Sequence, residues 1–114
     1  MNKKYHVERR EFLNKFTDMR AYVIGIVEDT REQHSCCDSK KERSEIILKI
    51  ADCSDEIDLW FDLRTSRDRE NSLYKIDQLA SVIAEVRDAI DLEVRSIEER
   101  EAVQQHARAA SVVH

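Results

Sequence analysis

The sequence contains no proline and a single glycine, Gly25. These two residue types end helices and form most tight turns, so their near absence argues against a fold of many short strands joined by tight turns. It favours a few long helices with short connections. The 114 residues are enough for one domain with a modest core.

Long uncharged segments and an excess of basic charge are also missing. Residues 21–27 form an uncharged run that is far shorter than the roughly 20 residues of a membrane-spanning helix. No apolar signal core follows the basic N-terminal residues, so we expect a cytoplasmic protein without membrane contact. The net charge of −5 disfavours general binding to nucleic acids, which depends on an excess of lysine and arginine.

The three cysteines are an odd number without the spacing of a disulfide framework, which predicts free thiols. His34, Cys36 and Cys37 are metal-ligating residue types in one polar segment, residues 31–38. Zinc sites usually separate paired cysteines by two or more residues, whereas these two are adjacent. We therefore expect an ordinary loop here, and keep a metal or redox protein that uses these three residues as a third possible function.

The clearest pattern that is present runs from Leu73 to Ile97. Its apolar residues follow steps of three, four, three, four and seven, which is the spacing of one side of a helix. They are Ile76, Leu79, Ile83, Val86, Ile90 and Ile97, with Leu73, Ala80 and Val94 beside them. This spacing predicts a long amphipathic helix over residues 67–107, whose start has candidate N-caps at Thr65, Ser66, Asn71 and Ser72.

Two further helices are predicted, over residues 3–30 and 39–63. The first follows Tyr5, Phe12, Phe16, Met19, Val23 and Ile26, with Gly25 as either a tolerated glycine or a kink. The second follows Ile46, Ile50, Cys53, Ile57 and Trp60. Ser39 and Glu42 have the spacing of a capping box, which places its start at Ser39.

These elements predict an all-α fold, an antiparallel three-helix bundle over residues 1–108 with a flexible tail at 109–114. The predicted C-terminal helix is longer than the other two and extends beyond their ends. Four large apolar residues also lie off the predicted seams, and together with this overhang they favour a homodimer that completes the bundle. They are Ile24, Leu48, Leu59 and Leu92.

Charged segments give two candidate interaction surfaces. An acidic run without basic residues contains Asp52, Asp55, Glu56, Asp58 and Asp62, and a helix would place Asp55 and Asp62 on one line. It is either a solvated face or, with Leu59 and Leu63, a docking surface for a basic partner. A basic N-terminal part contains Lys3, Lys4, Arg9, Arg10 and Lys15. This part is either ordinary helix surface, a surface that binds the acidic face of a second chain, or a contact for nucleic acid.

No motif for catalysis is present. The sequence has no Glu-x-x-His pair for a di-metal bundle, no glycine-rich phosphate loop and no serine in a strained turn beside a base. We therefore expect no enzyme, metal or cofactor, but a protein-interaction module such as an adaptor, assembly subunit or inhibitor. The alternative is a nucleic-acid-associated regulator or ribonucleoprotein subunit using the basic N-terminal helix. The expected partner-binding residues are Asp52, Asp55, Glu56, Leu59, Asp62, Leu48, Leu92, Arg9 and Arg10.

Overall fold

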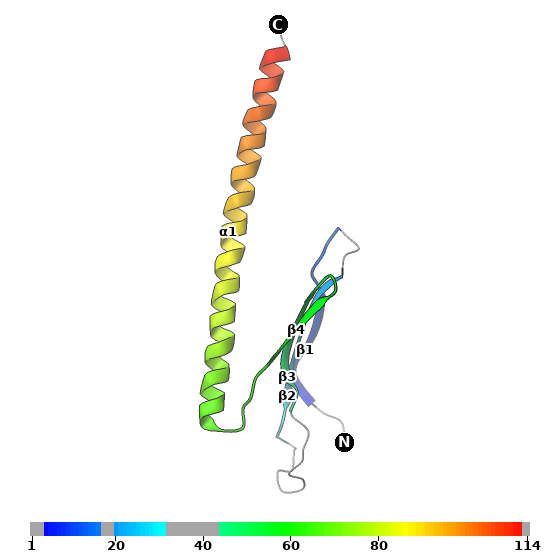
Figure 1. The fold of residues 1–114 in the computed structure, drawn as a ribbon, viewed down its shortest axis with the longest axis vertical. Helices are drawn as coiled ribbons and strands as arrows, with labels where there is room; N and C mark the ends of the chain where they lie inside the picture. Colours follow the sequence, from blue (N-terminus) through cyan, green and yellow to red (C-terminus); the bar gives the residue numbers. More distant parts are fainter. Residues whose placement is uncertain (1–3, 17–19, 32–43, 113–114) are drawn as a thin grey trace. The chain divides into compact units, whose positions relative to one another are not determined.

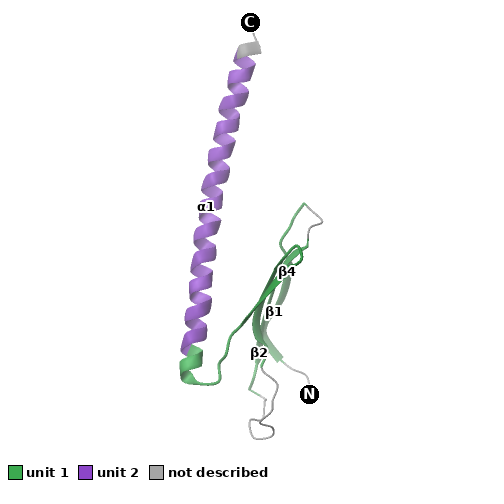
Figure 2. Cartoon of the chain, in the orientation of Figure 1, with its two compact units in different colours: residues 1–69 green, residues 70–114 purple. Residues whose placement is uncertain are grey.

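The computed structural model describes residues 4–16, 20–31 and 44–112 of the chain. In these ranges four strands precede one helix (Figure 1). They are β1 (Lys4–Phe12), β2 (Ala21–Asp29), β3 (Ile46–Asp52), β4 (Asp55–Trp60) and α1 (Ser66–Val112). The chain divides into two compact units, residues 1–69 and residues 70–114, so the sheet belongs to one unit and nearly all of the helix to the other (Figure 2).

This architecture contradicts the predicted all-α three-helix bundle, because the described parts of residues 3–30 and 39–63 are strands and connections rather than helices. The reason lies in residue type. β2 and β3 are rich in valine and isoleucine, whose branched Cβ atoms lower helix propensity and suit a pleated sheet. Their spacing of three and four residues is fortuitous. The capping box at Ser39 and Glu42 lies outside the described residues.

The four strands form one antiparallel sheet in the order β1-β2-β3-β4. Paired residues share a face and neighbours along a strand alternate, so the register assigns each residue to one of two faces. One face, which we call the apolar face, carries Val7, Val23, Val27, Ile46, Leu48, Ile50, Ile57 and Leu59, together with the charged Arg9 and Glu11 of β1. The other, the mixed face, carries Glu8, Arg10, Tyr22, Ile24, Ile26, Ile47, Lys49, Ala51, Glu56, Asp58 and Trp60.

The buried apolar side chains of the sheet belong to its two central strands. They are Ala21 and Ile26 on β2, and Ile46, Ile47 and Ala51 on β3. Ile26 and Ile47 lie directly opposite each other on the mixed face, whereas Ile46 points to the apolar face. Strands β2 and β3 have a neighbouring strand at both edges, so their side chains contact cross-strand neighbours on each face.

A two-residue turn joins β3 to β4, since Asp52 pairs with Asp55. Cys53 in this turn has a φ of 58°, the left-handed conformation that glycine, asparagine and aspartate adopt most easily. Its thiol is free and its side chain is exposed. The prediction that Cys53 lies on a buried helical seam is therefore wrong.

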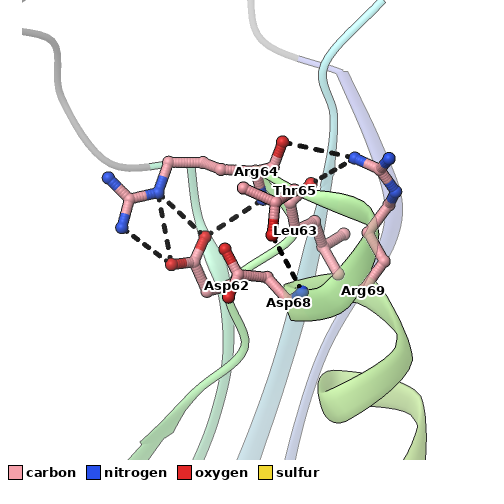
Figure 3. Close-up of polar contacts among 6 residues, drawn as sticks. All are labelled: Asp62, Leu63, Arg64, Thr65, Asp68 and Arg69. Carbon is pink, nitrogen blue, oxygen red and sulfur yellow. Dashed lines mark hydrogen bonds and ion pairs between the residues drawn. The ribbon is translucent and has the colours of Figure 1, made fainter.

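Helix α1 begins at Ser66, with Thr65 as its N-cap (Figure 3). The backbone N–H of Asp68 donates to the Thr65 hydroxyl at 3.0 Å, and the N–H of Arg69 donates to the Thr65 carbonyl oxygen. The Arg69 guanidinium also donates to the carbonyl oxygens of Leu63 and Arg64, which ties the connection to the first turn.

The helix contains 47 residues and is about 70 Å long. It continues to Val112, into the segment for which we expected a flexible tail. Within the described residues, no helix combines enough length with enough apolar character to cross a membrane.

Candidate functional site

An exposed apolar line runs along α1, and it is the most extensive unpaired apolar surface of the helical unit. We call it the α1 stripe: Leu73, Ile76, Leu79, Ile83, Val86, Ile90, Val94 and Ile97. Ile76 and Leu79 are half-buried, whereas the side chains of Ile83, Val86 and Ile90 are 53%, 51% and 58% exposed. The apolar spacing of the sequence predicts that these residues form a seam in the core of a three-helix bundle. The described parts of the two partner helices form strands instead, so the seam is exposed.

The stripe has the repeat of a coiled coil. Ile76, Ile83, Ile90 and Ile97 are seven residues apart and occupy position a, while Leu79 and Val86 occupy position d. From Ile76 to Ile97 the seam rises about 32 Å along the helix. A shallow hollow opens on it, lined by Ile83, Val86, Arg87, Ile90, Asp91 and Val94. Such hollows between side chains are where the knobs of a facing helix insert.

Charged residues interrupt the seam beyond Val86. Glu93 and Arg100 occupy the next two d positions, and their side chains form an ion pair with 3.0 Å between Nη2 of Arg100 and Oε2 of Glu93. Arg100 also donates from Nε to the Ser96 carbonyl oxygen. The two charges therefore neutralise each other within one helix, which lowers the cost of placing them at a helix interface.

The predicted acidic surface does not form one line. Asp52 and Asp55 flank the β3–β4 turn, Glu56 lies on the mixed face, and Asp62 follows β4. Asp62 accepts hydrogen bonds from the backbone and side chain of Arg64. The prediction that Asp55 and Asp62 share a helix face is therefore wrong.

Three of the other residues predicted for partner binding, Leu48, Leu59 and Arg9, lie on the same face of the sheet. Leu48 and Leu59 lie directly opposite each other on the apolar face, in one row with Gly25 and Arg9. Arg9 pairs with Glu11 at 3.0 Å.

The remaining predicted residues lie elsewhere. Arg10 projects from the opposite face of the sheet and lies 3.8 Å from Glu8. Because Arg9 and Arg10 point in opposite directions and each has an acidic neighbour, they do not form one basic patch. Leu92 lies on α1, away from the stripe, and its side chain is 66% exposed.

In two polar pairs of the sheet unit, a hydrogen bond changes the pKa of one partner. The Tyr22 hydroxyl donates to the Glu56 carboxylate across the sheet, and this hydrogen bond to a carboxylate is the main cause that raises the Tyr22 pKa. Hydrogen bonds from Arg31 lower the pKa of Asp29 to about 2. Both pairs are exposed contacts between neighbouring groups, and neither includes a nucleophile beside a base.

The proposed metal or redox residues His34, Cys36 and Cys37 lie outside the described residues. Among the residues that the structure describes, no group of three or more histidine, cysteine, aspartate or glutamate side chains is close enough to hold a metal ion. Comparisons with protein family models, curated proteins and solved structures find no match to this chain. The function is therefore argued from the chain's own residues.

Proposed function

We propose that the chain is a cytoplasmic, non-enzymatic protein-interaction module whose α1 stripe binds the same stripe of a second copy. The observation that carries this proposal is the row of exposed isoleucines at seven-residue intervals. β-Branched residues at position a with leucine or valine at position d pack well between helices. Self-association then joins two or more sheet units in one particle, as expected of an assembly subunit or adaptor.

The energy for this association comes from apolar surface. Burying an isoleucine or leucine side chain that was exposed contributes about 1.5–3 kcal/mol. Ile83, Val86 and Ile90 are each about half exposed, so each gains about half of that range on burial. Several such side chains on each helix together contribute several kcal/mol against the entropy cost of association, which is about 4–15 kcal/mol.

The test is the mass of the full chain in solution, by light scattering across a concentration series. We expect wild-type protein at two or more times the chain mass of 13.4 kDa. Ile83→Lys introduces a charge at position a and shifts the mass toward one copy. Ser81→Lys places the same side chain on the outer face two residues earlier, and should leave the mass unchanged. A wild-type mass of 13.4 kDa at all concentrations would refute the proposal.

A further inference from the structure

The sheet has two outer strands, β1 and β4, and among the described residues each has a neighbouring strand on one side only. β1 is the longer of the two, with nine residues, and all of them except Tyr5 are exposed. The outer edge of such a strand presents backbone N–H and C=O groups that can pair with another strand. Whether they do so depends on the side chains along the edge.

The backbone hydrogen bonds of β1 identify the groups that point away from the sheet. The Leu13 N–H donates to the Ala21 carbonyl oxygen at 2.9 Å, so Leu13 and every second residue back to Val7 bond to β2. The residues between them direct their N–H and C=O groups outward. These edge-facing residues are Glu8, Arg10 and Phe12.

Strand β4 has an edge with charges of one sign. The Phe61 N–H donates to the Ile46 carbonyl oxygen at 3.0 Å, so the same alternation directs the N–H groups of Glu56 and Asp58 outward. The six residues of β4 include three acids, the third being Asp55, and no base. Like charges oppose pairing with a second copy of the same edge, and charged side chains commonly protect edge strands in this way.

The charges along β1 are balanced instead. Residues 8–11 have the order Glu-Arg-Arg-Glu, with two negative and two positive side chains. The apolar side chains of Val7 and Leu13, on either side of this segment, are 46% and 53% exposed. A balanced edge does not repel its own copy, so β1 lacks the protection that the acids give to β4.

We propose that β1 pairs antiparallel with β1 of a second copy, in the register that places Arg10 on the two-fold axis. Arg9 of each copy then lies directly opposite Glu11 of the other, and opposite charges at such positions stabilise a strand pair. The same register aligns Val7 with Leu13, which are both apolar. These four residues occupy the non-hydrogen-bonded positions of the new ladder, where opposing side chains are closest.

The neighbouring registers are less favourable. Sliding one copy by two residues centres the pair on Arg9 or on Glu11, so that two like charges meet at the closest positions of the ladder. In the proposed register the like charges are those of Arg10, at a hydrogen-bonded position where the two strands are farther apart. Each Arg10 also has Glu8 of its own chain 3.8 Å away, which offsets its charge.

The alternative partner for β1 is β4 of a second copy. The best register would align Arg10 with Asp58, but Glu8 would then lie diagonal to the same aspartate. Glu11 would lie diagonal to Asp55, so the acids outnumber the bases along this contact. A contact between two different edges also continues into an open chain of copies, whereas the β1 pair is closed by its two-fold axis.

Amide hydrogen exchange of the full chain, followed by NMR, tests the pairing. The N–H groups of Glu8 and Arg10 should be protected by about tenfold or more relative to those of Glu56 and Asp58, which serve as the control on the other edge. Equally rapid exchange at both edges would overturn the proposal. Protection of both edges would overturn it as well, because it would indicate that β1 pairs with β4.

Two charge variants test the register. Arg9→Glu and Glu11→Arg each place like charges opposite each other between copies, so each should lose the protection of Glu8 and Arg10. An equal mixture of the two variants restores opposite charges between copies and should recover the protection. Both variants lack the ion pair of Arg9 and Glu11 within one chain, with 3.0 Å between Nε and Oε2, and mixing does not restore it. Failure to recover would overturn the register.

Asp58→Lys is the matched control, since it reverses a charge on the β4 edge and should leave β1 protected. The β1 pair is a contact separate from the α1 stripe, and the two proposals fail separately. Wild-type protein that associates but exchanges rapidly at Glu8 and Arg10 overturns the β1 pair alone. Protection of these residues in Ile83→Lys, at the concentration of an NMR sample, supports the β1 pair independently of the stripe.

Discussion

The Thr65 hydroxyl accepts a hydrogen bond from the backbone N–H of Asp68 at 3.0 Å and thereby caps the first turn of α1. The first N–H groups of a helix have no partner within the helix, so a side-chain oxygen at this position satisfies one of them. The helix consequently has a defined start, directly after the connection from the sheet.

We predict that Thr65→Ala lowers the stability of the helical unit by about 1 kcal/mol, because it leaves this N–H without its acceptor. Urea unfolding followed by circular dichroism at the helix band measures the change. Thr65→Ser keeps a hydroxyl in place and should retain most of the stability. Equal losses in the two variants would show that the hydroxyl does not cap the helix.

Replacement of Cys53 by glycine should stabilise the sheet unit. Cys53 has a φ of 58°, and a side chain in this conformation costs about 1–2 kcal/mol relative to glycine. Part of the gain is lost to the greater freedom of glycine in the unfolded chain, so we expect about 0.5–1 kcal/mol. Ser54→Gly is the control, since Ser54 does not have a positive φ and should gain nothing.

The hydrogen-bonded pair of Asp29 and Arg31 predicts that the stability of the folded protein depends on pH. The pKa of Asp29 is lowered to about 2 because the Arg31 side chain and backbone N–H donate to its carboxylate. A lowered pKa in the folded state stabilises the protein above the unfolded pKa of about 3.9, and this contribution disappears as the pH falls through 2.

Arg31→Ala should therefore raise the Asp29 pKa toward its ordinary value, as followed by NMR titration of the carboxyl carbon. The difference in stability between variant and wild type should be present at pH 5–7 and vanish below about pH 2. Arg64→Ala removes a similar partner from Asp62 and should leave the Asp29 titration unchanged.

Gly25 lies in the middle of β2, and neither a kink nor a positive φ requires a glycine there. A Cβ atom at this position would lie 4.0 Å from Cδ1 of Leu48, an ordinary contact. Gly25→Ala should therefore stabilise the sheet by about 0.5–1 kcal/mol in urea unfolding. Ala51→Gly, on the adjacent strand, should have the opposite effect. A loss of stability in Gly25→Ala would indicate that the strand requires glycine.

The helix was predictable from the sequence because local and periodic signals agree there. Residues 66–112 contain no glycine or proline, and Ile76, Ile83 and Ile90 repeat at seven residues. Its C-terminal end was not predictable from the stripe, which stops at Ile97. Strong helix formers such as Glu101 and Ala102 extend the helix by propensity rather than by an apolar pattern.

The sheet was not predicted because its central strands hide the alternation that identifies a strand. Ile46 and Ile47 are adjacent and both buried, on opposite faces, so the period of two disappears. The turn was missed because Cys53 occupies the place where glycine or asparagine would signal a hairpin. The same error hid the exposure of the candidate site: the stripe residues were identified, but we expected two helices to bury them, and the described parts of those segments form strands.

The exact seven-residue spacing of the four isoleucines has a mechanical consequence for the assembled protein. Seven residues of a straight α-helix fall slightly short of two full turns, so the isoleucine edge drifts about 20° around the axis with each heptad. Copies that keep Ile76 through Ile97 in contact must wind around one another to follow that drift. We therefore expect α1 to adopt a gentle left-handed superhelical twist whenever the copies associate.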